Sequence, residues 1–202
     1  MSLEQPRYQV IYKQDGIEYR LYQPYLVAET IIDDTGDYRA AGNEGFRRLF
    51  RFITGANQGS EKIAMTAPVA QAPAAGEKIA MTVPVARSAG ADGWRLAFML
   101  PSRYSLDTAP RPTDPRIYIR AVPGRLVAVL RYSGRWTDRN FAERQTQLTA
   151  VLDAAGVQIN GPVESAAYNG PFMPPFLRRN EVIAPITALP ASAPADALLA
   201  AR

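Results

Sequence analysis

The chain has 202 residues, of which 47% are hydrophobic and 21% charged, and its formal net charge at pH 7 is +4. This length and balance are those of one globular domain that buries its own core. The chain contains neither cysteine nor histidine. Their absence excludes disulfides, a Ser-His-Asp triad, a cysteine nucleophile, ordinary zinc and iron–sulfur sites, and the usual histidine or thiolate ligand of haem iron.

The same composition sets expectations about location and partners. No segment approaches the roughly 18–20 consecutive apolar residues that span a bilayer, and residues 1–20 lack the apolar core of a signal peptide. We therefore expect a cytoplasmic protein with no membrane span. The positive charge is almost all arginine and forms neither a long basic run nor a reading motif, so nucleic acid is not an expected partner. The oligomeric state is not indicated.

The first part of the chain predicts three strands and one helix. Polar and apolar residues alternate over Tyr8–Lys13 and Ile17–Tyr22, on either side of the turn dipeptide Asp15-Gly16, which is typical of paired strands. A third strand is expected over Tyr25–Ile32. Residues 37–54 change to helical periodicity and end at Gly55. The apolar stripe of this helix consists of Phe46, Leu49, Phe50 and Ile53.

A short sequence repeat follows the helix. Glu61–Val69 reads EKIAMTAPV, and Glu77–Val85 reads EKIAMTVPV. Alternation of period two predicts two similar strands, each with a proline that confines its end to an edge or bulge. The small residues of Ala70–Gly76 predict a loop between them. Trp94–Leu100 predicts another strand, and Pro101–Pro115 a proline-rich extended connection.

The second half of the chain repeats the order of elements. Arg116–Val122 and Arg125–Tyr132 predict a strand pair across the turn dipeptide Pro123-Gly124. Thr137 is the expected N-cap of a helix over Asp138–Ala155. The apolar stripe of that helix consists of Phe141, Leu148, Val151, Leu152 and Ala155.

Two final strands are expected over Val163–Tyr168 and Val182–Ile186, separated by the apolar, proline-rich loop Asn169–Arg179. The passes over residues 8–100 and 116–187 together predict an α+β fold. Duplicated strand-strand-helix-strand units would form a distorted antiparallel barrel or sheet with two helices. We expect one domain over residues 1–187 and an Ala/Pro-rich disordered tail over residues 188–202.

Several motifs resemble one known family. They are Lys62–Val69 (KIAMTAPV) and its second copy, Pro110–Pro115 (PRPTDP), and Tyr168 followed by Pro171 and Arg178–Val182 (RRNEV). In this order and over nearly the whole chain, they resemble the SOUL/haem-binding proteins of the bacterial type. The resemblance implies a fold related to the gyrase-inhibitor-like group of small-molecule-binding domains. It also implies a haem or tetrapyrrole cleft beside the first helix and the loop before the last strand.

On this sequence the resemblance implies a cleft lined by the helix, one repeat strand and the late loop. The implied cofactor-binding residues are Phe46, Phe50, Arg51, Met65, Tyr168, Phe172 and Met173. Some family members carry a proposed haem-ligating histidine where this chain has Leu21. We therefore expect a small planar apolar ligand held by apolar contacts, with an arginine such as Arg51 on a propionate, and no metal ligand from His or Cys.

Other interpretations remain open at this stage. Glu181 and Tyr168 also suggest a hydrolase or lyase in the same cleft, because some gyrase-inhibitor-like relatives resemble hydrolases with such a pair. The plainer interpretation is that Glu181 forms an ion pair with Arg178 or Arg179, that Arg51 is solvated and that Met65 packs in the core. The loop around Met173 either closes one end of the barrel or forms a cleft wall. Overall the sequence favours binding over catalysis.

Overall fold

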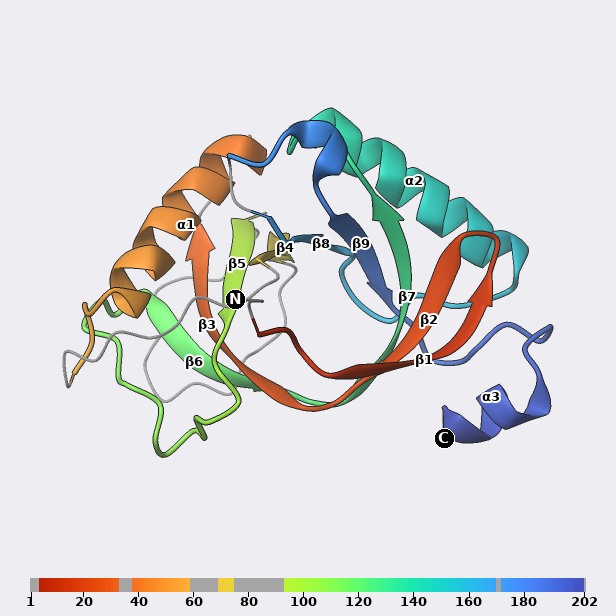
Figure 1. Cartoon of the computed structure of the whole chain (residues 1–202), viewed down its shortest axis with the longest axis horizontal. Coiled ribbons are helices and arrows are strands. Elements are labelled where there is room, and N and C mark those ends of the chain that lie inside the picture. Colours follow the sequence, from red (N-terminus) through yellow and green to blue (C-terminus); the bar gives the residue numbers. More distant parts are fainter. Residues whose placement is uncertain (1–3, 33–37, 59–68, 75–92, 170–171, 202) are drawn as a thin grey trace.

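The computed structural model of the chain describes residues 4–32, 38–58, 69–74, 93–169 and 172–201. These residues form nine strands, three α-helices and one short 3-10 helix (Figure 1). In chain order the elements are β1 (Tyr8–Gln14), β2 (Ile17–Tyr22), β3 (Tyr25–Ile32), α1 (Tyr38–Ile53), β4 (Val69–Ala74), β5 (Gly93–Met99), β6 (Ile117–Val122), β7 (Arg125–Tyr132), α2 (Asp138–Ala154), β8 (Glu164–Ala167), η1 (Pro175–Leu177), β9 (Asn180–Pro185) and α3 (Ala195–Ala200).

The strands form one antiparallel sheet in the order β1-β2-β7-β9-β8-β4-β5-β3-β6. Two units, β2-β3-α1-β4-β5 and β6-β7-α2-β8-β9, repeat the same order and meet where β4 pairs with β8. The first strand of each unit pairs with a strand of the other unit: β2 pairs with β7, and β6 pairs with β3. The predicted α+β class and the duplicated unit are confirmed. The sheet is open, because β1 and β6 form its two ends.

The strand pair predicted across Pro123-Gly124 is wrong, although both strands exist. β6 pairs with β3, whereas β7 pairs with β2 and β9. The Pro-Gly dipeptide lies where the chain crosses from one half of the sheet to the other, and residues 23–24 make the same crossing between β2 and β3. A Cβ atom at Gly124 would lie 3.1 Å from the backbone oxygen of Tyr22. The glycine therefore permits the two crossings to touch.

Both long helices cover the outer face of the curved sheet, α1 over β3 and β5 and α2 over β7 and β9 (Figure 1). The apolar stripe of α1 differs from the prediction, because Phe52 is buried and Phe50 is 42% exposed. A close approach explains this rotation. A Cβ atom at Gly45 would lie 2.8 Å from Leu96 of β5, so this side of the helix faces the sheet. Leu49 is buried as predicted.

The second helix follows the prediction closely. The Thr137 side chain caps α2 by accepting a hydrogen bond from the backbone N–H of Asn140 at 3.2 Å. Phe141, Leu148 and Leu152 are buried against β2, β7 and β9. After the last turn the chain reverses through Gly156, whose φ is +68°, a conformation that favours glycine.

The centre of the sheet differs from the prediction of a loop over Ala70–Gly76. Residues 70–74 belong to β4, which pairs with β5 on one side and β8 on the other. Backbone pairing on both sides overrides the low strand propensity of its small residues. The predicted repeat strands, Glu61–Val69 and Glu77–Val85, lie outside the described residues except for Val69, the first residue of β4.

The C-terminal segment also differs from the expected disordered tail. It contains α3, and Leu189, Ala193 and Ala197 are buried in the cluster that α2 forms with the sheet. Ala197 lies in α3, whereas Leu189 and Ala193 lie in the non-helical segment before it. Neither α3 nor any other helix of the described residues is long and apolar enough to cross a membrane.

Candidate functional site

The inner face of the sheet, opposite the helices, carries a buried network of charged and aromatic side chains. Glu181 of β9 is fully buried. It accepts hydrogen bonds from Arg20 of β2 at 2.8 and 3.0 Å, from Arg179 at 2.7 and 3.0 Å, and from the Tyr168 hydroxyl at 2.6 Å. Arg20 also donates to Glu18 at 2.7 and 2.9 Å. Five hydrogen bonds thus hold one carboxylate.

Burial and pairing both shift pKa values in this network. Burial alone raises the pKa of Glu181, but the hydrogen bonds and the charge of Arg20 outweigh it, and the pKa lies below its ordinary value. Burial raises the pKa of Tyr168 and raises the pKa of Tyr22 to about 12. At neutral pH, Glu181 is therefore an ionised carboxylate and Tyr168 a neutral phenol.

The N-terminal segment covers the network. The Arg20 guanidinium lies 4.3 Å from the ring centroid of Tyr8. Arg179 donates to the Tyr8 hydroxyl at 3.4 Å and to Gln5 at 3.3 Å. A general base must reach a substrate proton, and a carboxylate this buried and saturated does not. The geometry therefore supports the plainer interpretation of Glu181, an ion pair, with Arg179 and also with Arg20.

A second buried carboxylate occupies the other half of the inner face. Glu29 of β3 pairs with Arg120 at 2.8 Å and with Arg95 at 3.4 Å. Arg120 takes the position in β6 that Arg20 takes in β2, since the two arginines face Val27 and Val127 of equivalent strands. The duplication thus places one buried ion-pair cluster in each half. The sequence predicted the pair of Glu181 with Arg179 but missed Arg20 and the whole Glu29 cluster, because alternation shows which face a residue takes but not its partner.

Helix α1 presents aromatic side chains on one flank of its exposed surface. The rings of Phe46 and Phe50 are stacked at 5.8 Å with an interplanar angle of 14°. Phe46 is half-buried and makes an edge contact with Phe98 of β5 at 5.3 Å. Phe50 lies one turn further along the helix. The two stacked rings form an apolar wall, and Phe50 is the more exposed of the two.

Arg51 is the residue after Phe50, and it lines a pocket on the other flank of the helix. The pocket has a volume of about 410 Å³ and is lined by the C-terminal half of α1 and the start of β6, including Arg48, Arg51, Asp114 and Arg116. The Arg51 guanidinium is exposed and has no hydrogen bond or ion pair to any described residue. It is thus available to an anion.

The other two arginines of the pocket are already engaged. Arg48 donates to the Thr30 hydroxyl at 2.8 Å and pairs with Glu44 at 3.3 Å. Arg116 grips Asp114 with two hydrogen bonds at 2.7 and 2.9 Å, which lowers the pKa of Asp114 to about 2. Two cations are therefore matched by two anions, and the charge of Arg51 remains in excess.

The structure separates the residues that the sequence grouped into one cleft. Phe46, Phe50 and Arg51 lie on α1, over the outer face, whereas Tyr168 lies on the inner face with Glu181. Phe172 and Met173 lie on the late loop, whose described contacts are with the lead-in to α2. Met65 lies outside the described residues. No group of three or more carboxylates among the described residues is arranged to hold a metal ion.

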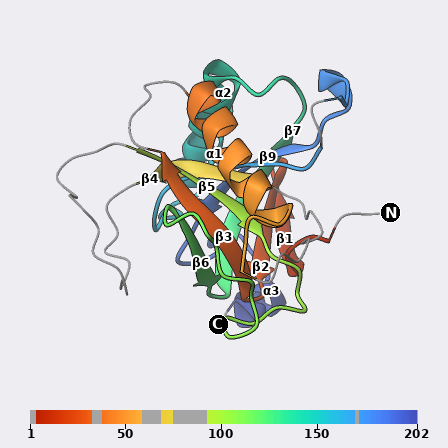
Figure 2. The same cartoon turned by 90° about the vertical axis from the view of Figure 1, so that its left-hand side faces the viewer.

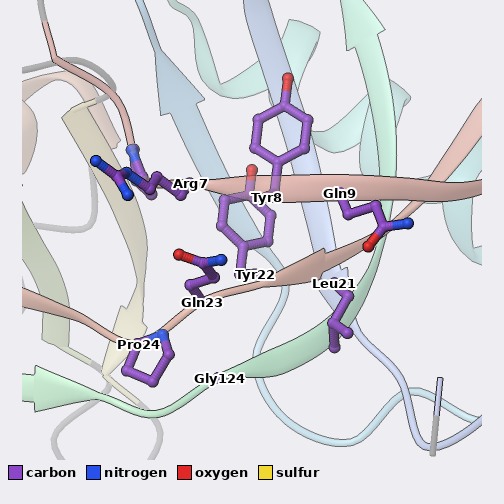
Figure 3. Close-up of a pocket in the computed structure, with 9 residues that line it drawn as sticks. Arg7, Tyr8, Gln9, Leu21, Tyr22, Gln23, Pro24 and Gly124 are labelled. Atoms are coloured by element: carbon purple, nitrogen blue, oxygen red, sulfur yellow. The ribbon is translucent and has the colours of Figure 1, made fainter. Parts of the chain in front are cut away.

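A larger depression, of about 820 Å³, lies at the ends of β1 and β2 and includes Gly124 (Figure 3). The rings of Tyr8 and Tyr22 project from one side of the strands and Leu21 projects from the other (Figure 3). The depression therefore wraps around the end of a strand pair and has no single apolar floor. None of the sequence-predicted site residues lines it, and we do not favour it as the site of a planar ligand.

Comparisons with known proteins agree with the fold. Residues 3–185 match the family model described as SOUL heme-binding protein. No curated protein matches the chain. Among solved structures, the chain is similar to the EcmrR C-terminal domain, with a TM-score of 0.58 and 10% identity over 90% of this chain and 99% of that one.

Two structures from Listeria innocua are similar as well. One is an uncharacterized conserved protein, with a TM-score of 0.59 and 8% identity over 86% of this chain and 93% of that one. The other is a hydrolase, with a TM-score of 0.52 and 8% identity over 87% and 94%. At such low identities the similarity shows the fold alone.

Proposed function

Because the chain belongs to the SOUL heme-binding protein family, we propose that it binds haem or another tetrapyrrole without a histidine or cysteine ligand. The ring is held by apolar contacts, and an arginine pairs with a propionate. One observation carries the proposal: α1 presents two stacked phenylalanines, Phe46 and Phe50, on one flank, and the next residue, Arg51, turned toward the other flank, has no partner among the described residues.

The aromatic wall suits one face of a flat macrocycle. Phe50 is stacked on Phe46 at 5.8 Å and is 42% exposed, and covering that exposed part contributes about 1 kcal/mol. Phe46 is fixed by its contact with Phe98, so little side-chain entropy is lost when a ligand lies against it. Phe172 and Met173 are not required for this arrangement.

Arg51 suits the polar edge of the same ligand. Successive residues on a helix point roughly 100° apart, so the guanidinium projects beside Phe50 rather than over it. A propionate there would gain charge-assisted hydrogen bonds from a guanidinium that loses no existing partner. The excess positive charge of the pocket makes that exchange favourable.

The donor set bears on the iron. The chain has no histidine or cysteine, and burial keeps Tyr22 and Tyr168 protonated, so neither supplies a phenolate ligand. Binding then depends on the macrocycle and its propionates, not on a protein–iron bond. Haem, when bound, would supply an iron centre that Tyr22 and Tyr168 do not ligate.

The test is a titration of the purified protein with hemin and, separately, with metal-free protoporphyrin IX, followed by absorbance and by quenching of tryptophan fluorescence. We expect saturation at about one equivalent and affinities for the two compounds within about threefold, because the iron gains no strong ligand. No saturable change at low micromolar hemin would refute the proposal. A strong preference for hemin would refute the unligated mode.

Matched variants separate the two contacts. Phe50→Ser removes half of the wall and Arg51→Ala removes the unpaired cation, and each should weaken binding about tenfold. Leu106→Ser, at an apolar residue exposed in another loop, and Arg47→Ala, one turn before Arg51, serve as controls. Equal loss in a variant and its control would exclude that contact from the site.

A further inference from the structure

The loop before β9 exposes large apolar side chains to an unusual degree. Phe172 is 98%, Phe176 75% and Leu177 60% exposed, and Met173 is partly exposed beside them. No described residue covers them. Contiguous apolar groups of this size on a soluble domain mark contact surfaces.

Hydrogen bonds hold the backbone of this loop in place although its apolar side chains are exposed. The backbone N–H of Gly134 donates to Pro175 at 2.9 Å, and Arg178 donates to the backbone oxygen of Met173 at 2.8 Å. The Arg178 guanidinium lies 4.3 Å from the ring centroid of Trp136. In Figures 1 and 2 the blue segment that includes η1 lies at the top of the molecule beside the lead-in to α2. A fixed, apolar tip can be covered at little entropic cost.

Positive charge is concentrated around this tip. Residues 131–144 and 172–178 together hold five arginines and two carboxylates, a net charge of +3, and Arg179 is not counted because Glu181 pairs with it. Arg135 is exposed, and Arg139 is exposed with only one surface partner, Glu143. An apolar tip packed on a lead-in segment that carries exposed arginines combines the two interactions that bind proteins to anionic membrane surfaces.

We propose that the loop 172–177 inserts into the interface of an anionic lipid bilayer, with the surrounding arginines on the lipid headgroups. Single-stranded nucleic acid fits less well, because Met173 and Leu177 have no ring on which a base can stack. A second copy of the chain bound at the same tip would bring the arginines of the two copies together, which like-charge repulsion opposes. This contact is separate from the tetrapyrrole site on α1.

The experiment is co-sedimentation of the full chain with vesicles of phosphatidylcholine alone and of phosphatidylcholine with phosphatidylglycerol. We expect binding to the anionic vesicles only, weakened by high salt because headgroup attraction is screened. The double variant Phe172→Ser/Phe176→Ser should lose at least about tenfold in partitioning. Arg135→Glu should lose binding to a smaller extent.

Controls make the result specific. Leu106→Ser and Arg7→Glu change exposed residues of other loops and should leave partitioning unchanged, while circular dichroism confirms that all variants fold. Three results would overturn the proposal: no binding to anionic vesicles, equal binding by the double variant, or a dimer in size-exclusion chromatography that the double variant abolishes. A hemin titration of the double variant keeps this contact distinct, because we expect it to be unchanged.

Discussion

The replacement Glu181→Gln tests whether the inner face is a structural core or a reaction site. Glutamine keeps the size of the side chain but removes the negative charge that Arg20 and Arg179 share. Its amide nitrogen is a donor, so it meets guanidinium donors where a carboxylate oxygen accepted their hydrogen bonds. Arg20 then remains buried with only Glu18 as an acidic partner.

The expected loss of stability follows from the burial of both partners of the ion pair. Arg20 and Glu181 are almost fully buried, and removal of one partner from such a pair costs about 3–5 kcal/mol. Arg179 is partly exposed and can turn to solvent, which places the estimate near about 3 kcal/mol. For a chain of this size, that corresponds to a fall in Tm of roughly 6–12 °C.

Thermal and urea unfolding followed by circular dichroism measure the loss. Glu143→Gln is the matched control, because its pair with Arg139 lies at the surface, where ion pairs contribute little to stability. A Glu181→Gln protein as stable as the wild type would refute the structural role and return the hydrolase interpretation. Because pairing lowers the pKa of Glu181, its contribution is complete at neutral pH and disappears as the pH falls below the ordinary carboxyl range.

Three further predictions test the fold. Gly45→Ala should lower the free energy of unfolding by about 1–3 kcal/mol, because the new Cβ atom would lie 2.8 Å from Leu96. This loss should exceed the gain from the higher helix propensity of alanine. A rise in Tm would contradict the packing of α1 on β5. Thr137→Ala should lower the free energy of unfolding, measured in urea, by about 1 kcal/mol, because it removes the N-cap side chain of α2. An unchanged free energy of unfolding would show that the cap is dispensable. Burial raises the pKa of Tyr22 to about 12, so its contribution to stability is complete below the ordinary value of 10.0 and is lost as the pH rises toward about 12. A tyrosinate absorbance titration that shows all tyrosines ionising together near the ordinary value would exclude this burial.

Periodicity alone predicted most of the elements but not how they pair. Alternation identified β2 and β3, and the cap and stripe of α2 were visible in the sequence, because these signals are local. The exchange of β2 and β6 between the two halves was not visible. A Pro-Gly dipeptide has the same local preference in a hairpin as in a crossing, and only long-range pairing distinguishes them.

The candidate site was predicted in part for a related reason. The sequence correctly placed Phe46, Phe50 and Arg51 on one helix, but it assigned Tyr168 to the same cleft, although Tyr168 lies on the inner face with Glu181. Strand parity gives the face of a residue only when the strand that it belongs to is placed in the sheet. Alternation in β2 places Arg20 on the opposite face of the sheet from Tyr19 and Leu21. Its partner Glu181, however, lies 161 residues away in the sequence.

The charged inner face supports our placing of the proposed ligand on the helical side. A curved sheet offers two surfaces to a planar guest. In β2, β7 and β9 the inner surface is occupied by Arg20, Glu181 and their aromatic neighbours, and the N-terminal segment covers it. Opening that surface for an apolar ring would expose or unpair buried charges, at a cost of several kcal/mol. The proposed ring on α1 would displace no ion pair between described residues, and Arg51 has no partner among them.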